Sequence, residues 1–410
     1  MAEIKPFKAY RPAKGLEDKI AALPYDVYNR EEAKEVVKAN PLSFLGIDRA
    51  ETQFDDSVST YDERVYAKAD SMLKEWIAKG RFIQDDKECF YLYQEEWKGR
   101  KQTGIVGCAS IDDYQNNIIK KHENTLVAKE QDRFNHIDVT GMQTGPIFLS
   151  FCSNGDIDAF ISKILDREPV YDFGSDDDVF HRVWVIDDDE DIAFLKASFA
   201  QMNAIYIADG HHRCASAVKV GLKRREERGD EGRCESDYFM SVLFPDNQLE
   251  IMDYNRVLKD KASLTDEELL KAVGEYCDIE KCNVAYKPVK KGEIGMLIED
   301  KWYKLTFKSE YLSDDAVDSL DVAFLSRYIL EKIWGITDPK TDSRIDFVGG
   351  IRGLKELEKR CREDCKVAFA MYPTSIRELF AVADEGRLMP PKSTWFEPKL
   401  RSGLFLHDIH

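Results

Sequence analysis

Five consecutive residues, Asp209–Arg213, combine an acid, a glycine, two histidines and an arginine directly after a hydrophobic stretch. The β-prone run Ile205–Ile207 predicts a short buried strand, and the apolar spacing that follows predicts a helix that stops at Gly221. Between them we expect a tight turn, in which Asp209 is the N-cap of the helix and Gly210 lets another group approach the backbone closely.

This predicted turn has the chemistry of an anion site. His211, His212 and Arg213 fall in the first turn of the helix, where unpaired backbone N–H groups and the helix dipole favour a negative charge. The guanidinium adds a fork that matches phosphate or carboxylate. The alternative is a capped helix whose histidines and arginine face water. Because the chain has only seven histidines, two of them beside an arginine favour the functional interpretation.

A second polar cluster lies in "KKHENTLVAKEQDRF", residues 120–134. His122 and Glu123 come just before a helical run in which Lys129 and Arg133 are four residues apart, so that one helix face could present two cations. A carboxylate next to such a face suits a base that works beside a bound anion. The spacing alone equally fits an ordinary charged helix with salt bridges between successive turns.

A third candidate is the segment "PPKSTWFEPKLRSG" near the end of the chain. It combines cations and hydroxyls with prolines that stiffen the loop, as an anion-binding lid or wall would require. The alternative is a tail that is packed by its aromatic residues and keeps its charges in water. The candidate ligands for an anion are Lys392, Ser393, Thr394, Lys399, Arg401 and Ser402.

The elements that must position these residues are of mixed type. In the N-terminal region a capping box at Asn29 and Glu32 starts a helix that must end before Asn40-Pro41. An amphipathic helix follows within residues 64–82, and Gly80 lies past its end. Alternating residues 89–97 and 98–111 predict a β-hairpin. We expect an α+β protein with an N-terminal α/β region (1–103), a catalytic core (104–257) and a C-terminal α+β region (258–410) that contributes to the site or covers it.

The composition excludes several classes of protein. A chain of 410 residues with 43% hydrophobic and 11% aromatic residues is not disordered, and 59 basic against 77 acidic residues give a net charge of −18 that would repel nucleic acid. Nine scattered cysteines fit neither a disulfide framework nor a zinc ribbon. The acidic runs "GSDDDVF" and "IDDDEDIAF" are typical of solvated turns and helix starts. We find no signal peptide and no membrane span, and expect a soluble cytoplasmic protein without a membrane partner.

The motif "KHENTL" followed by "ADGHHR" resembles the two motifs of the archaeal free serine kinases, which belong to the ParB/sulfiredoxin-like superfamily. The order is the same and the second motif matches residue for residue, although the gap between the motifs is longer here. The resemblance implies a ParB/sulfiredoxin-like core and a kinase that phosphorylates the hydroxyl of free L-serine to give O-phosphoserine.

Residue by residue, the resemblance implies that Glu123 is the general base. Asp209, with His211, takes part in catalysis, and Gly210, His212 and Arg213 complete the turn that holds phosphate, while His122 binds beside the base. Mg²⁺ is the expected cofactor, with ligands that the resemblance does not specify. The resemblance leaves ADP, ATP or pyrophosphate open as the phosphate donor, and the sequence contains no GxxxxGK[ST] loop that would indicate a conventional nucleoside triphosphate site.

Over its full length the chain also resembles a large bacterial and archaeal family of uncharacterised proteins, through "LPYDV", "KHENTL", "DR", "DGHHR" and "MPPKSTWFEPKLRSGL". That family brings no activity. The main alternative function is a ParB-like module that binds nucleotide for regulation without acting as a metabolic kinase. Sulfiredoxin chemistry is disfavoured, because histidine fills the place of the reactive cysteine and Cys214 follows the arginine. The same site could also catalyse the reverse reaction, as a phosphatase or phosphotransferase that converts phosphoserine to serine.

Overall fold

The three strands that the sequence predicts within residues 89–111 and 205–207 join one large sheet. The computed structural model describes residues 1–229 and 232–410. The chain divides into a first unit, Met1–Leu249 with Pro398–His410, and a second unit, Glu250–Glu397. These units do not coincide with the three predicted regions. Strand β5 (Arg100–Ser110) runs through the predicted boundary at 103/104, and the segment after residue 397 returns to the first unit.

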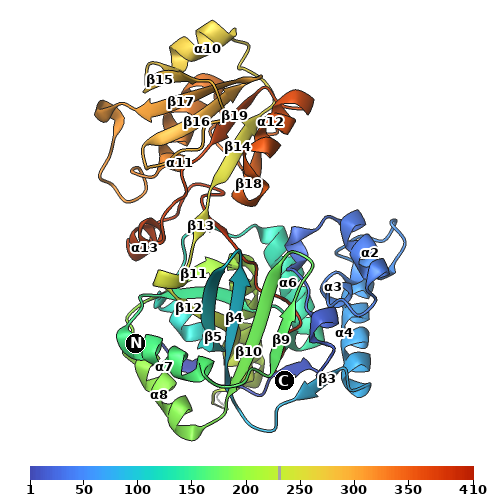
Figure 1. The fold of residues 1–410 in the computed structure, drawn as a ribbon. Coiled ribbons are helices and arrows are strands. Elements are labelled where there is room, and N and C mark those ends of the chain that lie inside the picture. The colour runs from blue at the N-terminus through green and yellow to red at the C-terminus, as the bar shows by residue number, and fades with distance from the viewer. Residues whose placement is uncertain (230–231) are drawn as a thin grey trace. The chain divides into compact units, whose positions relative to one another are not determined.

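The sheet of the first unit has nine strands within the described residues, in the order β6-β11-β8-β12-β5-β4-β10-β9, with β1 also paired to β5. Pairs β6/β11 and β8/β12 are parallel and the other pairs are antiparallel. This mixed sheet with its helices confirms the α+β class (Figure 1). The strands are β1 (Ile4–Lys5), β4 (Phe90–Trp97), β5, β6 (Ile119–Lys120), β8 (Ile147–Phe151), β9 (Tyr171–Gly174), β10 (Val179–Ile186), β11 (Ile205–Asp209) and β12 (Tyr238–Pro245).

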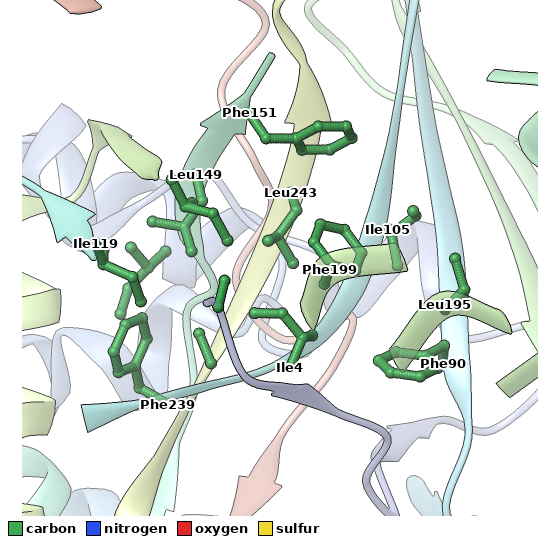
Figure 2. Packing of buried hydrophobic residues seen from close by; sticks show 14 of the residues in the cluster. Ile4, Phe90, Ile105, Ile119, Leu149, Phe151, Leu195, Phe199, Phe239 and Leu243 are labelled. Atoms are coloured by element: carbon green, nitrogen blue, oxygen red, sulfur yellow. The ribbon is translucent and has the colours of Figure 1, made fainter. Parts of the chain in front are cut away.

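The main core of the first unit lies between this sheet and three helices, α7 (Gly155–Leu165), α8 (Asp189–Ala200) and α9 (His211–Arg228). Figure 2 shows its aromatic and aliphatic side chains packed together. The rings of Phe151 and Phe199 meet edge to face, with 5.3 Å between their centroids. Burial of these apolar side chains fixes β11 and α9 against one another, and so fixes the turn between them.

A smaller core holds the helices of the N-terminal part together. The predicted capping box of Asn29 and Glu32 is confirmed at the start of α2 (Arg30–Ala39), which ends before Pro41. The amphipathic helix is confirmed as α4 (Glu63–Ala78), and residues 90–110 form the predicted hairpin. The remaining elements of this unit are β2 (Tyr10–Pro12), α1 (Glu17–Ile20), η1 (Tyr25–Val27), α3 (Leu45–Asp48), η2 (Ala50–Gln53), β3 (Phe82–Gln84), α5 (Ile111–Gln115), α6 (Val127–Thr140), β7 (Met142–Gln143), η3 (Glu235–Asp237), η4 (Asp246–Gln248) and β21 (His407–Asp408).

Helix α9 does not stop at Gly221, as the sequence predicted, but continues to Arg228. A Cβ atom on Gly221 would lie 2.3 Å from the backbone oxygen of Ser236 and 2.9 Å from Cδ1 of Ile111. The glycine therefore allows close packing of a continuing helix instead of ending it, at a cost in helix propensity of about 1 kcal/mol relative to alanine.

The second unit is a six-stranded antiparallel sheet in the order β15-β17-β16-β19-β14-β18, counted over its described residues. Its own core packs helix α12 (Gly353–Glu363) on the sheet. The other elements are β13 (Ile251–Met252), β14 (Tyr254–Leu258), α10 (Asp266–Val273), β15 (Cys277–Cys282), β16 (Glu293–Ile298), β17 (Lys301–Phe307), η5 (Ser309–Tyr311), α11 (Asp321–Phe324), the π-helix η6 (Leu325–Trp334), β18 (Ile345–Gly349), η7 (Gly350–Arg352), β19 (Val367–Ala370), α13 (Ile376–Asp384) and β20 (Trp395–Phe396).

Among residues 1–229 and 232–410, no helix is long and apolar enough to cross a membrane.

Candidate active site

The predicted strand, turn and helix are all present around Gly210. Strand β11 ends at Asp209, Gly210 has a left-handed backbone with φ 90°, and α9 begins at His211. The prediction that Asp209 is the N-cap is wrong, because Gly210 occupies that position and no side chain caps the helix. A Cβ atom on Gly210 would also lie 3.1 Å from Nε of Arg213. Glycine thus satisfies both the positive φ and the close approach of the guanidinium.

Asp209 lies beside two cations. Nζ of Lys399, from the segment that returns to the first unit, is 3.2 Å from Oδ2 of Asp209, and Nη2 of Arg213 is 3.9 Å from the same oxygen. Desolvation would raise the pKa of Asp209, but the charges of Lys399 and Arg213 outweigh it and hold that pKa well below its usual range. The aspartate is therefore ionised at neutral pH. The 36% of its side chain that is exposed to water also favours the charged form.

Hydrogen bonds bring the two sequence motifs together. The backbone N–H of His122 donates to Nε2 of His211 (3.4 Å), and the backbone N–H of Leu126 donates to Nε2 of His212 (2.9 Å). An imidazole nitrogen that accepts carries no proton, so each of these neutral rings has its proton on Nδ1. The first turn of α9 therefore holds the loop that carries the His-Glu pair.

The ring of His122 is buried and meets that of His211 edge to face, with 4.5 Å between ring centroids. Neither ring nitrogen of His122 makes a hydrogen bond of good geometry within the described residues, although the backbone of Ile207 lies near enough to act on its pKa. Burial lowers its pKa to about 4, in spite of the charge of Asp209, and burial also holds the pKa of His211 well below its usual range. Both imidazoles are thus neutral at pH 7, and His122 offers unused hydrogen-bonding capacity, which is costly unless a ligand or water uses it.

Glu123 follows His122 on this loop and is partly exposed. The loop connects β6, which pairs with β11 in parallel, to helix α6. At its far end Thr125 donates to Glu130, and the backbone oxygen of Glu130 accepts from Oγ of Ser216 on α9 (2.7 Å). The loop is therefore tied to α9 at both ends, while the role of Glu123 as a base stays a prediction.

The two cations predicted on α6 differ in their surroundings. Lys129 is exposed in the first turn of the helix, whereas Arg133 is buried. Nε of Arg133 donates to Asp132 (2.8 Å), and its guanidinium lies 4.0 Å from the ring centroid of Tyr25. The prediction of one face presenting both cations is therefore wrong, because packing of α6 against the N-terminal helices buries only one of the two positions.

Arg133 and Arg213 line the same cavity, which has a volume of about 30 Å³. Because one water needs at least about 10–15 Å³, this cavity has room for about two waters. Thr144, whose hydroxyl donates to Asp48 (2.8 Å), and Tyr25 also line it. None of Tyr25, Asp48 and Thr144 is among the site residues predicted from the sequence. "LPYDV" marks Tyr25, but no local pattern marks Asp48 or Thr144.

The candidate segment near the end of the chain is divided between the two units. Lys392, Ser393 and Thr394 belong to the second unit, where Oγ of Ser393 donates to the backbone oxygen of Pro390 (2.6 Å). Lys399 belongs to the first unit and contacts Asp209. Of the six predicted residues of this segment, the structure therefore brings Lys399 to Asp209 of the DGHHR turn, and Ser402 lines a cavity together with Arg213.

Arg401 anchors the returning segment in the first unit. Its Nη2 lies 2.6 Å from both carboxylate oxygens of Asp177, and its Nε donates to Nε2 of His181 (3.2 Å). Burial and the charge of Arg401 lower the pKa of His181 to about 3, so His181 is a neutral acceptor. This buried anchor, two residues beyond Lys399, positions the lysine at Asp209. The acidic run "GSDDDVF" thus has a structural partner, and no metal-binding group of three His, Cys, Asp or Glu occurs in the described part of the chain.

The first unit is thus an α+β domain in which a loop carrying a His-Glu pair is held against the strand-to-helix turn of β11 and α9. The chain belongs to the family described as "Protein of unknown function (DUF1015)", whose model matches residues 4–323.

Solved structures with a similar chain path include the free serine kinase in complex with AMP, which is 13% identical with a TM-score of 0.39 over 75% of this chain and 91% of that chain. A mutant of that kinase in complex with ADP is 12% identical, with the same TM-score and coverage. A conserved hypothetical protein from Pyrococcus furiosus is 14% identical, with a TM-score of 0.35 over 73% of this chain and 93% of that chain. A search of curated proteins finds no match. Similarities this low leave the activity to be argued from the residues of the site.

Proposed function

We propose that this protein is a small-molecule kinase with a ParB/sulfiredoxin-like core, which transfers a phosphoryl group to the hydroxyl of free L-serine and yields O-phosphoserine. The observation that carries the proposal is the meeting of the His-Glu loop with the DGHHR turn, in the same order as the motifs of the free serine kinases. His211 and His212 accept backbone hydrogen bonds from that loop, so the proposed base and the anion site are held together.

The parts needed for phosphoryl transfer are positioning, neutralisation of charge and a base near the attacking oxygen. In our proposal the N-terminus of α9, Arg213 and Lys399 bind the transferred phosphate. Asp209 holds both cations until the phosphate arrives, because a carboxylate and a phosphate compete for the same positive groups.

Glu123 accepts the proton of the serine hydroxyl as that oxygen attacks the phosphorus atom, and the bond between phosphorus and the leaving phosphate of the donor breaks. His122 is the group we place beside the reacting hydroxyl, since its neutral ring can donate and accept one hydrogen bond each.

A Mg²⁺ ion would neutralise the phosphates of an ADP, ATP or pyrophosphate donor. Such an ion commonly needs only one or two carboxylates in addition to phosphate oxygens. Glu123 and Asp209 are the carboxylates of the two motifs, so the donor set fits an ion that arrives with the phosphates.

The test is to incubate the purified protein with L-serine and Mg²⁺ in parallel with ATP, ADP and pyrophosphate, and to measure phosphoserine by mass spectrometry. We expect product with one donor and a loss of about 10²–10⁴-fold on Glu123→Gln, the usual contribution of a general base. The exposed Glu168→Gln is the matched control and keeps full activity. Full activity of Glu123→Gln would remove the base from the proposal.

Nucleotide binding with no phosphoserine from any donor would contradict the kinase and favour the regulatory nucleotide-binding module. Calorimetric titration of ADP and ATP into the same protein separates that outcome from a failure to bind nucleotide at all.

A further inference from the structure

The second unit has a hollow of its own, with a volume of about 490 Å³. It lies beside the loop that precedes β16 and the start of α11, and the proposed kinase site does not use it. Its lining is mainly aromatic and acidic, and includes Gly292, Phe307, Tyr311, Asp318, Asp321 and Phe324. A hollow of this size is in the range of small-molecule sites, which measure about 300–1,000 Å³.

Asp321 is the buried charged group of this hollow, with 8% of its surface exposed. Its two carboxylate oxygens accept from a single donor, the backbone N–H of Gly292 (3.1 and 3.0 Å), and it makes no ion pair with any described residue. One N–H bond leaves most of the acceptor positions of a carboxylate unused. A buried carboxylate without a cation is costly, and burial accordingly raises the pKa of Asp321 to about 7.

The cations near this carboxylate have other partners. Lys291, at the rim of the hollow, pairs with Glu378, which is also part of the capping box of α13. Arg327 binds Asp318 through two contacts of 2.9 Å each. The protein therefore supplies a buried negative group and directs its own nearby positive groups elsewhere.

The aromatic side of the hollow complements this carboxylate. The rings of Phe307 and Phe324 are stacked, with 3.7 Å between their centroids. The ring centroid of Tyr311 lies 5.2 Å from that of Tyr276 and 5.1 Å from that of Tyr328. The faces of aromatic rings attract organic cations. A metal ion would instead need several oxygen, nitrogen or sulfur ligands, and no such group of three is present in the described residues.

We propose that this hollow is a second ligand site, which binds a small organic cation with an ammonium group, Asp321 as its counter-ion and the aromatic residues around its carbon atoms. The site is independent of the proposed kinase function, because all its residues belong to the second unit.

The test is calorimetric titration of the full chain at pH 8 with two ammonium probes, choline and isopentylamine, and with their neutral counterparts, 3,3-dimethylbutanol and isopentyl alcohol. We expect at least one cation to bind about tenfold or more tightly than its neutral counterpart, which corresponds to a single desolvated charge contact. Asp321→Asn should remove that difference, while Asp300→Asn, an exposed control, should keep it. If neither cation binds better than its neutral counterpart, the proposal is overturned.

Lys291→Met provides a variant with the opposite expected sign at an exposed residue. Removal of this positive charge should tighten binding of the ammonium probe by about threefold, as expected for a partly screened charge at the rim. A loss of affinity in Lys291→Met would contradict a cation site, and it would do so even if Asp321→Asn failed to fold.

Discussion

Asp209 ends strand β11 in the first unit and Asp321 begins helix α11 in the second, and their pKa values are shifted in opposite directions from that of a free aspartate. Asp209 has Lys399 and Arg213 beside it, and its pKa lies well below the usual range. Asp321 has one backbone N–H, and burial raises its pKa to about 7. The difference shows that the partners of a carboxylate, more than its residue type, decide whether it is charged at neutral pH.

The two aspartates are thus suited to different tasks. A carboxylate that stays ionised can hold cations in place for an incoming phosphate. A carboxylate that titrates near neutrality is incomplete without a positive partner, and a ligand can supply that partner. Three substitutions would break or sharpen this contrast.

The largest expected effect comes from Asp321→Asn, which removes the buried charge but keeps the shape. A carboxyl group with a raised pKa stabilises the fold below its unfolded pKa, and this contribution is lost as the pH rises from about 4 through 7. Because one pKa unit corresponds to about 1.4 kcal/mol, the rise from 3.8 to about 7 costs the second unit at most about 4 kcal/mol at pH 8.

The measurement is hydrogen exchange of the β16 amides in both proteins at pH 5 and pH 8. The variant should be the more protected protein at pH 8, and the difference should be smaller at pH 5, where (5 − 3.8) × 1.4, or about 1.7 kcal/mol, of it remains. Equal protection at both pH values would show that Asp321 titrates like an exposed carboxyl group.

The second effect comes from Lys399→Met, which makes Asp209 more like Asp321. If the proposed kinase activity is correct, turnover should fall by about 10²-fold, the usual loss on removal of one electrostatic contact to a transition state. The pKa of Asp209 should also rise, so that the acid limb of the pH-rate profile moves to higher pH. Lys14→Met is the matched control, since Lys14 is exposed. Unchanged turnover and an unmoved acid limb would separate Lys399 from the site.

The smallest effect is expected for Lys129→Met. Lys129 is a predicted phosphate ligand, but its side chain is exposed at the start of α6. Turnover should change by less than about twofold, since exposed charges are screened by water and salt. The phosphoserine assay is sufficient to check this. A loss comparable to that of Lys399→Met would restore Lys129 to the phosphate site and would show that the contrast depends on distant cations as well as adjacent ones.

The parts of the fold that the sequence predicted correctly depend on neighbouring residues. The capping box of Asn29 and Glu32 and the hairpin of β4 and β5 are examples, because both patterns are complete within a few positions. Predictions failed where a distant segment decides the outcome. Gly221 continues α9 because it packs against the backbone of Ser236, and no local signal reports that contact.

The candidate site follows the same division. The two motifs and their order were visible in the sequence, whereas the cavity beside Arg213 is lined by Asp48 and Thr144, which lie far from both motifs along the chain. The composition of the C-terminal segment does not show whether Lys392 or Lys399 reaches Asp209. Lys399 does so because the chain returns to the first unit at Pro398, after Lys392.

The return of the C-terminal segment to the first unit has a consequence for how the protein is made. A ribosome that adds about 5–20 residues per second needs roughly 7–30 s to synthesise residues 250–397, which separate Leu249 from Pro398. During that interval the nascent chain holds Asp209 without Lys399, and the anchor formed by Arg401 and Asp177 does not yet exist. The ion pairs of Lys399 and Arg401 therefore form only after the second unit has been synthesised, so that products of premature termination within that unit would lack both of them even if their first 249 residues had folded.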